Sequence, residues 1–233
     1  MIVDMHSHVL ANVDDGSSSL AESVAMLRLE AQQNISRVVA TPHFYARHDT
    51  PERFLRRREE AYRKLAEELK NHPGCPEVKL GAEVYFFSGM SHVDSLKLLT
   101  IDGKRCILLE MPQPPWTDKM YREIAEIREK LDIIPVIAHV DRYIGRFRTF
   151  GIPEKLEELP VLVQANARFF LQRSTRGMAM RMLQKNQIHL LGSDCHNLEE
   201  RKPRLGEALS VIEAGLGAAA LEQIRDYQDL VFE

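Results

Sequence analysis

Short apolar runs recur along the chain, and longer stretches with helical or loop character separate them. Seven such runs occur, several of them apolar at nearly every position: residues 2–5, 37–41, 78–86, 106–110, 133–138, 161–165 and 188–192. Nearly continuous apolar runs suit strands that are buried on both faces of a parallel sheet. The pattern predicts an α/β fold whose strands form either a closed barrel or a doubly wound sheet.

Helical patterns lie between these runs. Ser19 and Glu22 have the spacing of a capping box, and apolar residues then follow on one helical face up to Ile35. Further helices are expected near 51–71, 117–131, 175–185 and 203–214. No linker or composition break divides the chain, so residues 1–233 are expected to form one domain.

The composition excludes several classes of protein. The 31 basic and 34 acidic side chains give a net charge of −3, which disfavours a general nucleic-acid binder. No run approaches the roughly 20 apolar residues of a membrane-spanning helix, and no secretory signal is recognisable. Three scattered cysteines, Cys75, Cys106 and Cys195, are too few for a disulfide framework. A cytoplasmic location is therefore expected.

Side chains that bind metals follow the expected strands. Six of the seven runs carry His, Asp or Glu near their carboxyl ends, where the active sites of barrel enzymes lie. The candidate ligands are His6, His8, Asp15, His43, Glu83, Glu110, His139, Asp194 and His196. Residues two apart on a strand point the same way, so His6 and His8 can bind one ion, as can Asp194 and His196.

The number and chemistry of these candidates indicate a hydrolase with more than one metal ion. A catalytic metal needs about three protein ligands and one open position, so nine candidates suggest two or three ions. Nitrogen and oxygen ligands without thiolate favour manganese, iron, cobalt or zinc. Magnesium rarely binds so many imidazoles.

Two arginines follow ligand positions on the loops at the same end. Arg142 comes three residues after His139, and Arg201 comes five residues after His196. A guanidinium binds phosphate through paired donors. The alternative is that both arginines form local ion pairs with carboxylates at 141, 199 and 200. Five aromatic residues on nearby loops could contact a substrate ring or pack in the core, and the sequence does not decide between these roles: Phe44, Tyr45, Phe86, Phe87 and Trp116.

The spacing from Cys195 to Arg201 also matches the C-x5-R motif of thiolate tyrosine phosphatases. In those enzymes a glycine-containing loop surrounds the phosphate, and the thiolate attacks it. Here the loop has no glycine, and Glu199 and Glu200 would repel a phosphate. We therefore expect a mechanism that does not use Cys195 as nucleophile.

The ordered motifs resemble the PHP (polymerase and histidinol phosphatase) superfamily, in particular its manganese-dependent tyrosine phosphatases of the CpsB/CapC type. The segments that carry the resemblance are 5–8 (MHSH), 13–16 (VDDG), 41–43 (TPH), 81–85 (GAEVY), 109–111 (LEM), 137–142 (IAHVDR), 164–166 (QAN) and 193–197 (SDCHN). The resemblance implies a distorted seven-stranded (β/α)7 TIM-like barrel with three metal ions, most often manganese.

The resemblance also implies a role for each candidate. His6, His8 and Asp194 would bind the first metal, and Glu83 would bridge it to the second. Glu110 and His139 would complete the second site. The third metal would be bound by Asp15, His43 and His196. Arg142 and Arg201 would hold the phosphate. Many superfamily members have histidine where this chain has Asp15 and Glu110, and the acidic residues suit the tyrosine phosphatase branch.

The implied activity is hydrolysis of phosphotyrosine in a protein, expected to be a bacterial tyrosine autokinase that controls capsular or exopolysaccharide synthesis. A phosphoesterase acting on a small phosphomonoester, such as histidinol phosphate, is the main alternative. An amidohydrolase, which normally has a bridging lysine, and a non-catalytic interaction domain are two others. The oligomeric state and the natural phosphoprotein stay open.

Overall fold

The computed structural model describes residues 2–144 and 151–233, and its strands confirm the parallel α/β class. The strands are β1 (Val3–Ser7), β2 (Arg37–Ala40), β3 (His43–Phe44), β4 (Glu77–Leu80), β5 (Glu83–Tyr85), β6 (Cys106–Glu110), β7 (Ile134–Ile137), β8 (Leu162–Asn166) and β9 (Leu190–Gly192). Every paired strand is parallel to its neighbour. The strand orders are β1-β2-β4 in one sheet and β3-β5-β6-β7-β8-β9 in the other.

The expected count of seven barrel strands is not confirmed. The apolar run 37–41 stops at β2 and gives way to β3 after Pro42, and the run 78–86 divides into β4 and β5 around Gly81. Proline has no backbone N–H to donate to a ladder, which favours an interruption there. The six-stranded sheet is open, and single hydrogen bonds connect it with the smaller sheet, for example Asp194 N to His6 O at 2.8 Å.

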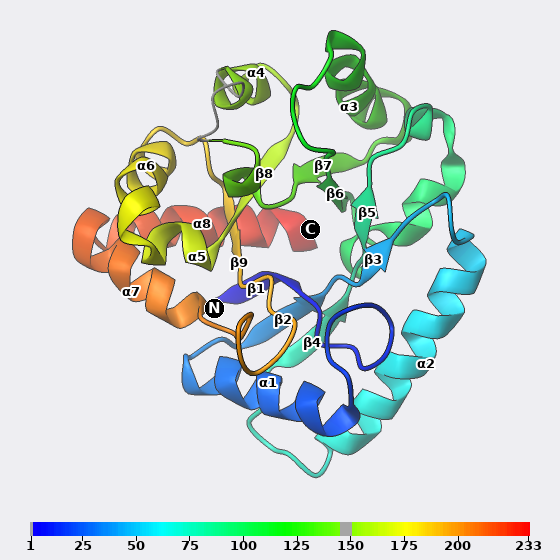
Figure 1. The fold of residues 1–233 in the computed structure, drawn as a ribbon, viewed down its shortest axis with the longest axis vertical. Coiled ribbons are helices and arrows are strands. Elements are labelled where there is room, and N and C mark those ends of the chain that lie inside the picture. The colour runs from blue at the N-terminus through cyan, green and yellow to red at the C-terminus, as the bar shows by residue number, and fades with distance from the viewer. Residues whose placement is uncertain (1, 145–150) are drawn as a thin grey trace.

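Eight α-helices lie among the described residues. They are α1 (Leu20–Gln32), α2 (Pro51–Leu69), α3 (Asp118–Leu131), α4 (Ile152–Glu157), α5 (Ala167–Leu171), α6 (Arg173–Gln184), α7 (Leu205–Leu216) and α8 (Ala218–Phe232). The helices surround the strands (Figure 1). The Ser19 side chain caps α1 by accepting from the Glu22 amide at 3.2 Å, as its spacing predicts. None of the described helices is long and apolar enough to cross a bilayer.

The core has two parts, and the strands lie between them. The inner cluster contains alternate strand residues such as Met5, Leu108 and Leu190, while the outer cluster packs Ile107 and Leu109 against the helices. This arrangement buries both faces of the strands, as the apolar runs predict. Helix α8, which the sequence patterns did not predict, contacts the start of β1: the Gln228 amide donates to Val3 O at 2.8 Å and accepts from Val3 N at 3.2 Å.

Candidate metal centre

The nine predicted ligands lie together at the carboxyl ends of the strands, although their positions in the elements differ in detail from the prediction. N–O distances of 4.0 Å or less connect all of them. His6 lies in β1 and Glu110 ends β6, as expected. His43 and Glu83, however, begin the short strands β3 and β5, which are paired in register with each other.

The structure fixes which nitrogen of His6 and of His8 faces the centre. Gln164 Oε1 accepts from the backbone N–H of His139 at 2.7 Å, so this oxygen also accepts the proton of His6 Nδ1, at 3.2 Å. Asp14 Oδ2 accepts likewise from His8 Nδ1 at 2.7 Å. Both Nε2 atoms are therefore lone-pair donors in the neutral rings, and they lie 3.1 Å apart. Two lone pairs at this distance repel each other unless a proton or a metal cation lies beside them, and the carboxylates of Asp14 and Glu83 outweigh burial and raise the pKa of His8 to about 10 when no metal is bound.

Glu83 lies at the middle of the cluster. Its Oε2 lies 3.1 Å from His6 Nε2, 3.3 Å from His8 Nε2 and 3.0 Å from His43 Nδ1. Its Oε1 accepts from His139 Nε2 at 2.7 Å. Burial disfavours the charged form of Glu83, but the surrounding imidazoles outweigh burial and hold its pKa well below the usual range. A buried carboxylate with both oxygens used in this way can bridge two cations.

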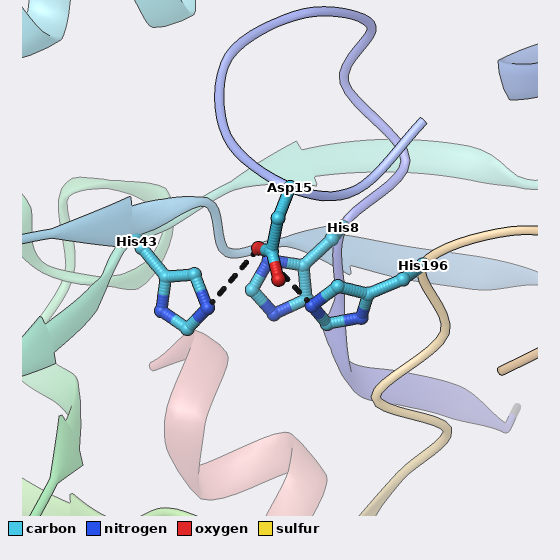
Figure 2. Close-up of side chains that lie close together, drawn as sticks. All are labelled: His8, Asp15, His43 and His196. Atoms are coloured by element: carbon cyan, nitrogen blue, oxygen red, sulfur yellow. Dashed lines mark ion pairs between the residues drawn. The ribbon is translucent and has the colours of Figure 1, made fainter. Parts of the chain in front are cut away.

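An outer group surrounds Asp15 (Figure 2). Asp15 Oδ1 lies 3.4 Å from His43 Nε2 and 3.4 Å from His196 Nε2, and these three side chains come from separate loops and strands. The ring of His8 lies 3.9 Å from that of His196, centroid to centroid. Burial, with the nearby His8, lowers the pKa of His196 to about 4, so this ring is neutral at pH 7 and able to donate a lone pair.

Glu110 and His139 lie on the other side of Glu83. Glu110 approaches His139 Nε2 at 3.7 Å and His43 Nδ1 at 3.9 Å. Burial and the charge of Glu83 raise the pKa of Glu110 to about 7. Two carboxylates so close in a buried site repel each other, and a shared cation would relieve that repulsion.

Two ligand positions have a left-handed backbone. His139 has φ of 33° and Asp194 has φ of 54°. Such angles are uncommon outside glycine and often occur at functional sites. They turn the chain sharply after β7 and β9, which directs both side chains back toward the cluster.

The donor set suits metal ions. Among the described residues, several buried atoms of the cluster have no hydrogen-bond partner, namely His43 Nδ1, Glu83 Oε2, Glu110 Oε2, His139 Nδ1 and His196 Nε2. Buried polar atoms without partners are costly, so their concentration here points to a ligand.

Within the cluster, three groups of side chains have ligand atoms within 4.8 Å of one another: His6, His8 and Asp194; His43, Glu83 and Glu110; and His8, Asp15, His43 and His196. The first group is the set expected for the first metal. The other two groups both contain His43. The residue expected with Glu83 and Glu110, His139, also lies beside them, with Nε2 2.7 Å from Glu83 and 3.7 Å from Glu110.

Arg142 and Arg201 converge on Asp194. Arg201 Nη2 donates to Asp194 Oδ1 at 2.7 Å, and Arg142 Nη2 donates to Asp194 Oδ2. Neither arginine forms an ion pair with the carboxylates at 141, 199 or 200 in the described part of the chain. Both side chains are about one-third exposed, 35% and 37%. Two guanidinium groups thus face solvent at the rim of the cluster.

Cys195 is unsuited to attack a phosphate. Its side chain is fully buried and faces Asp4 and Glu30, behind the cluster. Burial and these two acids raise the pKa of the Cys195 thiol well above its usual value. The resemblance to the C-x5-R motif is therefore a coincidence of spacing.

Three orienting residues were not among the predicted site residues. Asp14 and Gln164 fix the histidine tautomers, and the Asn166 amide donates to Asp194 Oδ2 at 2.9 Å. Their signal in the sequence is position: Asp14 adjoins Asp15, while Gln164 and Asn166 lie two apart at the end of β8.

Comparisons with known proteins identify the family of the chain. The family described as "Capsular polysaccharide synthesis, CpsB/CapC" matches residues 2–228. Tyrosine-protein phosphatase CpsB of Streptococcus agalactiae is 26% identical, over 96% of this chain and 94% of its own. Tyrosine-protein phosphatase YwqE of Bacillus subtilis is also 26% identical, over 93% and 86%.

A solved structure has the same fold at a TM-score of 0.84. It is described as YwqE from Bacillus subtilis and CpsB from Streptococcus pneumoniae, unique metal-dependent tyrosine phosphatases, and it is 23% identical over 99% of this chain and 94% of the solved one. The protein therefore belongs to the CpsB/CapC family of capsular polysaccharide synthesis.

Proposed function

We propose that this protein is a metal-dependent hydrolase of phosphotyrosine in proteins. The observation that carries the proposal is the pair of partly exposed guanidinium groups, Arg142 and Arg201, at the rim of a buried cluster of histidine and carboxylate ligands. Cations in the cluster and guanidinium groups at its rim would together bind a phosphate dianion. The family membership and the names of its relatives support the same activity.

The proposed metal ligands are the nine residues His6, His8, Asp15, His43, Glu83, Glu110, His139, Asp194 and His196. They would hold two or three ions, manganese first, with iron, cobalt or zinc as alternatives. Bound ions would supply positive charge to the phosphate and lower the pKa of a water molecule toward neutrality.

The chain's own residues bind and orient the substrate. Arg142 and Arg201 would take two phosphate oxygens, exchanging part of their contact with Asp194 for the ligand. Asn166 would keep Asp194 in place during this exchange through its hydrogen bond to Oδ2. A phenolate leaving group has a pKa near 10, so it needs less proton donation than an alkoxide does. A site that supplies mainly charge and position therefore suits an aryl phosphate.

The proposed substrate is a phosphotyrosine protein, such as a bacterial tyrosine kinase that acts in capsule or exopolysaccharide synthesis. The family description supports the link to capsule synthesis. We also propose a cytoplasmic location, which the free Cys75, Cys106 and Cys195 support.

The proposal is tested by phosphate release from a phosphotyrosine peptide. Protein stripped by a chelator should be inactive, and manganese should restore turnover. The His6→Ala and Asp194→Ala variants should lose activity by at least about 1,000-fold, whereas Cys195→Ser should stay active, because its thiol does not face the site. Activity that survives in the stripped enzyme, or that disappears in Cys195→Ser while the fold is intact, would contradict the proposal.

A further inference from the structure

A hollow of about 470 Å³ opens beside the candidate metal centre, and the mechanism proposed above does not use it. Its walls are largely aromatic or apolar and include Tyr45, Tyr85, Phe86, Phe87, Pro112 and Met120. Tyr45 connects the two regions: its ring lies 5.4 Å from that of His43 and 5.6 Å from that of Tyr85, centroid to centroid. Tyr45 therefore lies between the hollow that it lines and the candidate ligand His43.

A second hollow of about 260 Å³ adjoins the first. The two share Ala46 and Phe87 in their walls, and the second continues along Leu96 and Leu99 toward the start of α2. We call these two adjoining hollows together the trough. A phosphomonoester smaller than a drug-sized ligand, which occupies a pocket of about 300–1,000 Å³, would leave much of the two hollows unfilled.

The rim of the trough carries uncompensated positive charge. Arg47 is exposed and lines the first hollow, and in residues 2–144 and 151–233 no carboxylate lies within ion-pair distance of it. The neighbouring acid, Asp49, is already paired with Arg53 at 2.8 Å and with Arg57 at 2.7 Å. Arg47 is thus available to form an ion pair with an acidic side chain of a bound molecule.

We propose that the trough binds the polypeptide that flanks the phosphotyrosine, with an apolar side chain in the aromatic hollow and an acidic side chain beside Arg47. This inference rests on the proposed function and narrows its substrate to acidic phosphotyrosine peptides. Its basis is the position of Tyr45 between the trough and His43, the apolar walls of the trough, and the charge of Arg47, which has no carboxylate partner among the described residues. A small phosphomonoester would need none of these features.

The test compares kcat/KM of the manganese-loaded enzyme for three substrates. They are a phosphotyrosine peptide with glutamate on both sides of the phosphotyrosine, the same peptide with lysine there, and para-nitrophenyl phosphate. The wild-type enzyme should prefer the acidic peptide to the basic one by about tenfold or more. Arg47→Glu should abolish or reverse this preference, while Arg63→Glu, an equal charge change on an exposed part of α2 outside the trough, should retain it.

A second variant tests the trough without changing charge. Ala46 is exposed at the junction of the two hollows, so Ala46→Trp should block the path of a peptide. The ratio of acidic-peptide to para-nitrophenyl phosphate kcat/KM should fall about tenfold, whereas the exposed Ala219→Trp in α8 should leave it unchanged.

Two outcomes would overturn the inference, and they are distinguishable. Hydrolysis of para-nitrophenyl phosphate with no preference between the peptides, or a preference that Arg47→Glu leaves intact, contradicts the trough alone. No hydrolysis of any of the three substrates contradicts the proposed function, and this inference with it.

Discussion

Single polar residues outside the ligand set decide what the histidines can do. Asp14 and Gln164 each hold a Nδ1 proton, and this leaves the Nε2 atoms of His6 and His8 for a cation. Partners of this kind fix the tautomer and the ring orientation of metal-binding histidines. The metal affinity of the site therefore depends on residues that touch no metal.

The Asp14→Asn variant should bind manganese about 10- to 100-fold more weakly than the wild type. The amide keeps the shape of Asp14 but removes the charge that holds His8 Nδ1–H at 2.7 Å, and it weakens the acceptor of the His43 backbone N–H at 2.9 Å. Competition with a metal-sensitive dye would measure the affinity. Asp226→Asn, at an exposed position of α8, is the matched control, and equal affinity in both variants would contradict the orienting role.

Arg201→Ala should affect phosphate binding rather than metal content. The Arg201 side chain lies at the rim and is 37% exposed, whereas Asp194, the ligand that it contacts, is 5% exposed. Inhibition by inorganic phosphate should weaken by about tenfold or more, because a charge-assisted contact is lost. Metal analysis of the purified variant should give the wild-type content, as should that of the control Arg204→Ala. A parallel loss of bound metal would count against the phosphate role.

At the scale of elements, the close approach of β1 to the end of β9 holds His6 and Asp194 together. The approach requires a residue without a side chain at position 192. A Cβ atom there would lie 2.5 Å from His6 Cβ and 3.0 Å from His6 N, closer than real contacts allow. Gly192 therefore sets the distance between the two parts of the first metal group.

Gly192→Ala should destabilise the protein by about 1–3 kcal/mol, because β1 must shift to make room. The shift displaces His6, so metal content should fall together with the melting temperature. Gly177→Ala in α6 is a suitable control: its Cβ would meet only Arg181 Nη1, at 3.9 Å. That helix substitution should be neutral or stabilising by about 0.5–1 kcal/mol. A wild-type melting temperature in Gly192→Ala would contradict this prediction, because it would mean that β1 and β9 can move apart without a loss of stability.

His189, next to β9, should make stability depend on pH. Burial lowers its pKa to about 4, and its Nδ1 accepts from the Val163 N–H at 2.9 Å, which needs the neutral ring. The unfolded chain, with a pKa near 6.5, takes up the proton first. This part of the stability is therefore complete above pH 6.5 and is lost as the pH falls toward 4.

Because His189 is partly exposed, we expect the loss to be of order 1 kcal/mol. Denaturant unfolding of the wild type and of His189→Asn at pH 7.5 and pH 4.5 measures it. The difference between the two proteins should be smaller at pH 4.5. A control substitution of the exposed His92 by Asn should show no such change, and a constant difference for His189→Asn would contradict the assignment.

At the scale of the whole molecule, the sequence predicts the location of the site better than the connections around it. Ligand types at strand ends place His6, Glu110 and Asp194 correctly, because parallel strands bring their carboxyl ends to one side. The short strand β3 after Pro42 and the division of the run 78–86 at Gly81 were not predicted, because a single proline or glycine can mark an interruption but does not show where the chain pairs again. Gln164 reads as an ordinary polar residue until β8 is placed beside His6 and His139.

The two ends of the strands differ in polarity and in what packs against them. Helix α8 packs at the start of β1 through Gln228, and Val231 joins the inner cluster. The inner core is apolar at that end and polar at the opposite end. The polar end concentrates carboxylates such as Glu83 and Asp194, with 1% and 5% exposure, and burial together with the charge of Glu83 raises the pKa of the neighbouring Glu110 to about 7 when no cation is bound.

Removal of metal should therefore lower the stability of the entire chain. An ion at 100 times its dissociation constant stabilises a one-site protein by about 2.7 kcal/mol. For a chain of this size each kcal/mol corresponds to about 2–4 °C, so stripping should lower the melting temperature by roughly 5–10 °C.

Manganese should restore the melting temperature of the stripped wild type at pH 7.5. At pH 5 the rise in melting temperature should be smaller, because imidazoles bind metal only when neutral. Scanning calorimetry with and without chelator measures the difference, and His6→Ala should reduce it, since that variant loses a ligand of the first group. Identical melting curves for loaded and stripped wild type would mean that arginines and protons compensate these carboxylates without a metal. In that case the stability of the fold would not depend on metal binding, and the metal would contribute to catalysis alone.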